Sequence, residues 1–235
     1  MTAIFDAIEL AARAHRGQCR KGTKIPYIVH PLAVAKILLE ACCAEDVVVA
    51  GILHDTVEDT PLSLDEIRHT FGDPVARIVE GASEPDKSKP WEERKTHTIE
   101  FLRTASEAVL LVSCADKIEN LRAIREDRER VGEEVWTRFR RGRNQQAWYY
   151  RSVLAALEER LTAEPGPPLV QRLRKAVEAV FGRGKDWPKN RFTVSQPGND
   201  SGYASLFPVC SMMMDATTRT TPNTCQGLMI SSRKK

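Results

Sequence analysis

The chain has 235 residues, of which 42% are hydrophobic and 29% charged, and its net charge is +3. This composition suits a globular protein with one core of about 180 residues. It contains no apolar run of roughly 18 residues, which excludes a membrane-spanning helix, and its acidic amphipathic start predicts no signal peptide.

The positive charge lies in the C-terminal part of the chain. Residues 1–184 carry 28 basic and 29 acidic side chains, whereas residues 185–235 carry seven basic and three acidic ones. A nucleic-acid-binding domain needs a basic face, and the only basic cluster here is Arg138–Arg143. We therefore expect no nucleic-acid partner and no membrane partner. We divide the chain into a domain at 1–184 and a polar, basic tail at 185–235.

Helical periodicity runs through the first half of the domain. Ser63 and Glu66 form a capping box that opens a helix ending at Phe71, and Asp73 with Pro74 starts the next one. The earlier segments are expected as helices at 3–17, 31–42 and 46–56, with a loop at 18–27.

The second half of the domain is also helical in pattern. After a polar loop at 84–90, we expect helices at 91–105, 107–126, 131–161 with a break near Gly142, and 167–182. No segment alternates as a strand does, so the predicted fold is all-α. Polar residues without a sustained period follow, and this weakly ordered tail is either a dispensable extension or a regulatory segment.

One segment of the chain, Gly51–Thr60, places a histidine and three carboxylates directly after an apolar run. His54 and Asp55 taken alone fit either a helix-end cap or a metal site. His30 before Pro31, and Asp116 at the end of an apolar helical turn, favour the metal, because a lone buried carboxylate is costly. The metal ligands are then His30, His54, Asp55 and Asp116, a nitrogen and oxygen set suited to Mn, Fe or Zn.

Four segments together resemble a known family. The chain is similar to HD-domain metal-dependent phosphohydrolases, and specifically to the (p)ppGpp-hydrolase domain of the RelA/SpoT family in its stand-alone form, which includes the metazoan SpoT homologues. The resemblance implies an HD-type multi-helix bundle with a metal site in its centre and Mn²⁺ as the metal. It rests on Ala14–Gly22, Pro26–Pro31, His54–Asp59 and Ala115–Asn120.

The resemblance also implies roles for polar residues near the metal ligands. Glu58 and Asp59 match the pair that acts on the hydrolytic water, although the same two residues could simply cap a helix end. Arg20 and Lys21 match a pair of cations that bind the nucleotide, and Asn120 matches an asparagine that contacts the ribose.

Other residues carry weaker signals. Tyr149, within Trp148–Tyr150, either walls the nucleotide pocket or packs in the core, and Arg143 is a candidate contact for a distal phosphate. His15 is expected to be a core histidine and not a ligand. Glu119 stands where many relatives have a histidine, which predicts surviving hydrolysis with an altered substrate preference or weaker binding.

We expect a manganese-dependent enzyme that removes the 3′-pyrophosphate of (p)ppGpp. The alternatives are removal of the 2′-phosphate of NADPH on the same scaffold and a non-catalytic nucleotide-binding module. The partner is a small nucleotide, and assembly into a homo-oligomer stays open. Six cysteines without metal-site spacing predict reduced thiols and a cytoplasmic location.

Overall fold

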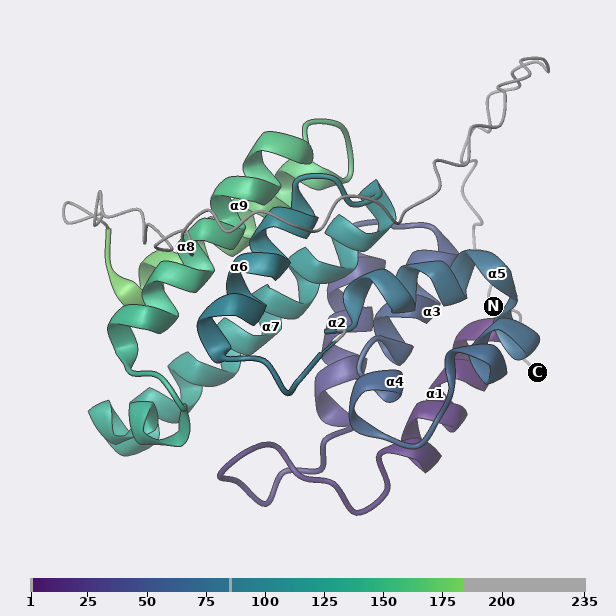
Figure 1. The fold of residues 1–235 in the computed structure, drawn as a ribbon, viewed down its shortest axis with the longest axis horizontal. Coiled ribbons are helices and arrows are strands. Elements are labelled where there is room, and N and C mark those ends of the chain that lie inside the picture. The colour runs from purple at the N-terminus through teal and green to yellow at the C-terminus, as the bar shows by residue number, and fades with distance from the viewer. Residues whose placement is uncertain (1, 85, 184–235) are drawn as a thin grey trace, which may run out of the picture. The chain divides into compact units, whose positions relative to one another are not determined.

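The computed structural model describes residues 2–84 and 86–183, and these residues form helices joined by loops (Figure 1). No strand occurs in this described part, where one isolated bridge joins Cys19 to Pro26. The prediction of an all-α fold is therefore confirmed. The elements are α1 (Thr2–Ala14), α2 (Val29–Glu40), α3 (Glu45–Leu53), α4 (Thr56–Asp59), α5 (Leu64–Ala82), α6 (Trp91–Leu102), α7 (Glu107–Val131), η1 (Gly132–Arg138), α8 (Arg143–Arg160) and α9 (Gly166–Phe181).

Helix α7 is the central element of the bundle. It packs against α2, α3 and α5 on one side and against α8 and α9 on the other, so it joins the two halves seen in Figure 1. Between Val109 and Ile124 its side chains are mostly buried, as expected for a helix that is covered nearly all round. A carboxylate placed in this stretch, such as Asp116, is therefore held inside the protein.

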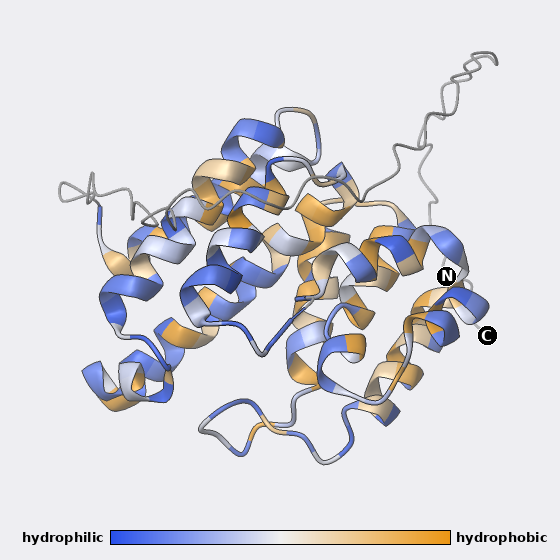
Figure 2. Ribbon diagram, viewed as in Figure 1, coloured by the Kyte–Doolittle hydropathy of each residue, from blue (hydrophilic) through white to orange (hydrophobic). Residues whose placement is uncertain are grey.

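Helix α3 is a second buried element, and Figure 2 shows how apolar residues concentrate around it and the middle of α7. Every residue from Val47 to Leu53 is buried. Gly51 allows α2 and α3 to approach closely, because a Cβ at this position would lie 2.5 Å from Leu38 Cδ1. The close packing of these two helices brings their histidines, His30 and His54, together.

Several helix ends differ from those predicted from the sequence. The expected helix at 46–56 ends at Leu53, and after two turn residues the short α4 continues to Asp59. The expected helix at 131–161 is divided, since α7 extends to Val131, η1 follows, and α8 begins at Arg143 after Gly142. Gly132 has a φ of 66°, which ends the α-helical geometry there.

The capping box at the start of α5 is present as predicted. The Ser63 side chain accepts a hydrogen bond from the Glu66 N–H, and the Glu66 carboxylate accepts one from the Ser63 N–H. Gly72, with a φ of 86°, breaks the helical geometry inside α5, where the sequence predicts one helix to end and another to begin.

No described helix has the length and apolar character needed to cross a membrane. The predicted tail at 185–235 lies outside the described residues.

Candidate metal centre

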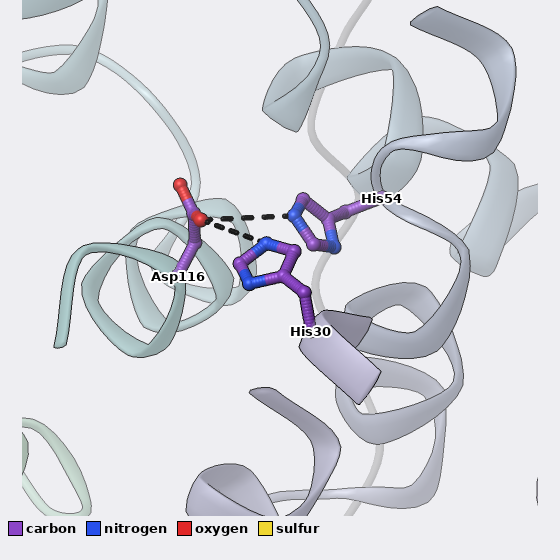
Figure 3. Close-up of side chains that lie close together, drawn as sticks. All are labelled: His30, His54 and Asp116. Carbon is purple, nitrogen blue, oxygen red and sulfur yellow. Dashed lines mark ion pairs between the residues drawn. The ribbon is translucent and has the colours of Figure 1, made fainter. Parts of the chain in front are cut away.

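Three buried side chains meet where α2, the end of α3 and α7 come together (Figure 3). One ligand atom from each of His30, His54 and Asp116 lies within 4.8 Å of the others. Asp116 Oδ1 lies 3.2 Å from His30 Nε2 and 3.8 Å from His54 Nε2. The three groups therefore converge on one point from three helical segments.

Asp55 lies beside this group. Its Oδ2 is 3.1 Å from His54 Nε2 and 3.4 Å from His30 Nε2. The Tyr27 hydroxyl donates a 2.6 Å hydrogen bond to the same oxygen and orients the carboxylate. The break between α3 and α4 places Asp55 here, because it directs two consecutive side chains towards one centre.

The ring of His54 is oriented by the end of its own helix. Its Nδ1 lies 2.9 Å from the Gly51 carbonyl oxygen, which can only accept, so Nδ1 carries the proton in the neutral ring. Its Nε2 is buried and has no hydrogen-bond partner among the described residues. In the neutral ring this buried nitrogen carries a lone pair that faces two carboxylates, an arrangement that fits a metal ligand.

Asp116 is held by two neighbours on its own helix. Lys117 Nζ donates to Oδ2 at 2.5 Å, and Asn120 Nδ2 donates to Oδ1 at 2.5 Å. Lys117 therefore occupies Oδ2, while Oδ1 accepts from Asn120 and also faces the two imidazoles. A carboxylate oxygen has two lone pairs, so Oδ1 retains one that a cation at the centre could use.

The centre carries strong electrostatic fields. Burial alone would lower the pKa of His54, but Asp55 and Asp116 outweigh it and raise that pKa to about 9. Burial likewise opposes ionisation of Asp116, yet Lys117 and the two histidines hold its pKa well below the usual value. Burial also opposes ionisation of the half-buried Asp55, but the two histidines lower its pKa. Two carboxylates that stay ionised attract positive charge, which a divalent cation could supply.

A cavity of about 580 Å³ opens from this centre. Glu58 and Asp59 line it on the α4 side, and Asn120 and the buried Tyr149 line it on the opposite side. The cations that line it are Arg77, Lys95 and Lys117, and Lys95 Nζ lies 5.1 Å from the centre of the Tyr149 ring. The cavity thus combines carboxylates at one wall with an aromatic ring and cations at another.

The cations predicted to bind substrate differ in their positions. Arg20 donates a 3.0 Å hydrogen bond to Asn120 Oδ1 and is thereby fixed near the cavity. Lys21 is exposed, and none of Arg20, Lys21 and Arg143 is among the described residues that line the cavity. The Nε of Arg143 is buried without a hydrogen-bond partner in the described part of the chain.

Other sequence expectations have clear structural counterparts. His15 is buried, packs its ring 4.7 Å from that of Tyr27, and places Nδ1 2.8 Å from Gln18 Oε1, as expected for a core histidine. Glu119 is buried, and Arg122 holds both of its carboxylate oxygens at 2.7 and 2.8 Å. Because Glu119 does not line the described cavity, its charge is directed away from the space where substrate would lie.

Sequence reasoning missed three residues that contact this site. Tyr27 and Lys117 lie inside the recognised segments, three residues before His30 and directly after Asp116, so their positions in those segments could have identified them. Lys87, which contacts Glu58 and Asp59, comes from the polar loop before α6. Nothing in the local pattern distinguished it from the other lysines of that loop.

A protein-family model described as "HD domain" matches residues 7–145, which include all four predicted ligands. Among curated proteins, the chain is 43% identical over 140 residues to "Guanosine-3′,5′-bis(diphosphate) 3′-pyrophosphohydrolase MESH1" of Homo sapiens, covering 58% of this chain and 75% of that protein. The protein of the same name from Danio rerio is 39% identical over 166 residues, covering 67% and 89%.

The similarity reaches longer proteins as well. A GTP pyrophosphokinase of Streptomyces coelicolor is 42% identical over 125 residues, but the match spans only 15% of that protein. Among solved structures, lmo0812 from Listeria monocytogenes is 40% identical with a TM-score of 0.60, covering 66% of this chain and 99% of that one. A metazoan ortholog of SpoT, described as hydrolysing ppGpp, is 29% identical with a TM-score of 0.61, covering 75% and 94%.

Proposed function

Because this chain belongs to the HD domain family, we propose that it is a metal-dependent hydrolase that removes the 3′-pyrophosphate of (p)ppGpp. The products are GDP or GTP and pyrophosphate. The observation that carries this proposal is the buried cluster of His30, His54 and Asp116, with Asp55 beside it, at the base of a cavity. The human and zebrafish relatives named above as 3′-pyrophosphohydrolases support the choice of substrate.

The metal in this proposal is one Mn²⁺, held by His30, His54, Asp55 and Asp116. A mixed set of imidazoles and carboxylates suits a labile ion of this kind. When bound, such an ion supplies positive charge that stabilises the phosphoryl group and makes water more acidic. The buried Nε2 of His54 and the remaining lone pair of Asp116 Oδ1, which faces His30 Nε2 at 3.2 Å, support the assignment.

Glu58 and Asp59 are the proposed catalytic pair. Both line the cavity on the side of Asp55, and a carboxylate there can accept the proton that a water molecule loses when it attacks phosphorus. The Glu84 N–H donates a 3.0 Å hydrogen bond to Glu58 Oε2, which leaves lone pairs on this carboxylate for a water molecule.

The nucleotide is proposed to lie against the opposite wall. Arg20 and Asn120 are already joined by a hydrogen bond, and Tyr149 presents a ring with Lys95 above it. We assign ribose contact to Asn120, base or phosphate contact to Arg20 and Lys21, and stacking or packing against the nucleotide to Tyr149. Arg143 is kept as a contact for a distal phosphate that extends beyond the cavity.

The domain organisation and location are part of the same proposal. We place the catalytic domain at 1–184 and a tail at 185–235. The four cysteines of the described part, Cys19, Cys42, Cys43 and Cys114, are all free, which agrees with reduced thiols and a cytoplasmic protein.

The test is a product assay with the purified full chain and Mn²⁺. The protein is incubated separately with ppGpp, NADPH and ordinary nucleotides, and the products are separated by ion-exchange chromatography. We expect GDP and pyrophosphate from ppGpp. Phosphate and NADH from NADPH alone would instead assign a 2′-phosphatase, and binding of ppGpp without turnover would assign a nucleotide-binding module.

A further inference from the structure

The loop between α5 and α6 contacts the two carboxylates of α4 through one lysine. Lys87 Nζ lies 3.1 Å from Glu58 Oε1 and 2.5 Å from Asp59 Oδ1. It also donates a 3.1 Å hydrogen bond to the backbone carbonyl of Glu58. One ammonium group therefore touches both side chains and the carboxyl-terminal end of α4, where helix carbonyls lack intrahelical partners.

The second oxygen of Glu58 is held by the same loop. The Glu84 N–H donates to Glu58 Oε2 at 3.0 Å, so the loop contacts both oxygens of this carboxylate. The loop is itself anchored on α6, because the Glu84 carboxylate pairs with Arg94 and lies 3.4 Å from Lys95 Nζ. Figure 1 shows this loop leading from α5 to α6.

Adjacent carboxylates such as Glu58 and Asp59 repel one another, and each has side-chain torsions that are free in solvent. A cation shared by both removes the repulsion and restricts those torsions. A group that must hold a water molecule for attack gains rate from such restriction, because small displacements of reacting groups reduce rates strongly.

We propose that Lys87 is a positioning residue that holds Glu58 and Asp59 in the orientation needed for catalysis. This inference rests on the proposed hydrolytic function. Lys87 acts through the carboxylates and not on the nucleotide, since it is absent from the described residues that line the cavity.

The test compares Lys87→Ala and Lys87→Arg with a matched control, Lys89→Ala, which removes an exposed lysine from the same loop. Each full-length protein is assayed with Mn²⁺ on ppGpp and on bis(p-nitrophenyl) phosphate, a small phosphodiester that needs no nucleotide contacts. We expect Lys87→Ala to lower kcat roughly 10- to 100-fold on ppGpp with little change in KM. Lys87→Arg should recover most of the loss, and Lys89→Ala should match the unsubstituted protein.

A thermal unfolding scan separates positioning from general stability. The Lys87 side chain is 47% exposed, so Lys87→Ala should shift Tm by less than about 2 °C. A normal kcat in Lys87→Ala would overturn the inference, as would a rise in KM alone, which would make Lys87 a substrate contact. Turnover of the small phosphodiester but not of ppGpp would contradict the proposed substrate while leaving the effect of Lys87 measurable. If the unsubstituted protein turned over neither substrate, both the proposed hydrolytic function and the proposed role of Lys87 would be overturned.

Discussion

Around His30, His54 and Asp116 the polar side chains are buried and contact one another, whereas the cations assigned to the nucleotide are less buried. His30, His54 and Asp116 are each at most 8% exposed and are oriented by neighbours such as Gly51 and Lys117. Lys21, by contrast, is exposed and outside the described cavity lining.

Under the proposed function, the two sides have different tasks. A metal needs ligands held at fixed distances, and packing in a core provides that rigidity. A charged nucleotide can attract flexible cations from some distance, so its contacts need less preorganisation. We therefore expect substitutions on the metal side to reduce catalysis much more than substitutions on the nucleotide side.

The largest effect is expected for Asp55→Ala. Loss of a carboxylate that faces both imidazoles should weaken Mn²⁺ binding by at least roughly 100-fold and abolish turnover. Isothermal titration with Mn²⁺ and the ppGpp assay measure the two effects. Asp46→Ala, an exposed acidic residue in the first turn of α3, is the control. Unchanged Mn²⁺ affinity in Asp55→Ala would remove Asp55 from the ligand set.

Glu58→Gln is expected to have the next largest effect. The amide keeps the shape of the side chain and can still accept from the Glu84 N–H, but it cannot take a proton. Turnover of ppGpp should fall about 100- to 10,000-fold while Mn²⁺ binding is retained. Full activity in this variant would contradict the role assigned to Glu58.

Tyr27→Phe tests a residue that contacts the proposed metal ligand Asp55. Removing the hydroxyl deletes the 2.6 Å hydrogen bond to Asp55 while the ring can still pack against His15. We expect Mn²⁺ affinity to fall about 10-fold, measured by titration, because partners of a ligand tune its orientation. An affinity equal to that of the unsubstituted protein would mean that packing alone orients Asp55.

The smallest effects are expected on the nucleotide side. Lys21→Ala and Arg143→Ala should raise KM for ppGpp by less than about 10-fold, the equivalent of one modest charge-assisted contact, without lowering kcat. Arg20→Ala should raise KM more than either, because Arg20 is fixed to Asn120. Steady-state kinetics measures the KM of each variant. A larger rise in KM for Lys21→Ala than for Arg20→Ala would contradict the proposed ranking of these cations.

Local patterns predicted much of the fold correctly. The Ser63 capping box, the break at Gly72 and the all-α character depend on interactions within a few residues, and each is present. The division of the expected helix at 131–161 was only partly anticipated, since Gly142 marked the start of α8 but the 3₁₀ segment before it had no strong local signal. Helix ends of this kind are decided by packing as well as by propensity.

The sequence by itself determined the helical class and the identity of the chemical groups, because helix periodicity, caps and the short histidine–aspartate segments are properties of neighbouring residues. Only the tertiary structure decided which of those groups meet. Residues 30, 54, 55 and 116 come together because α2 and α3 approach across Gly51 and pack on α7. The contact of Lys87 with Glu58 likewise depends on how the loop after α5 packs on α4, which no short segment encodes. The pairing of Glu119 with Arg122, by contrast, is a contact between residues three apart on α7 and follows from helix geometry alone.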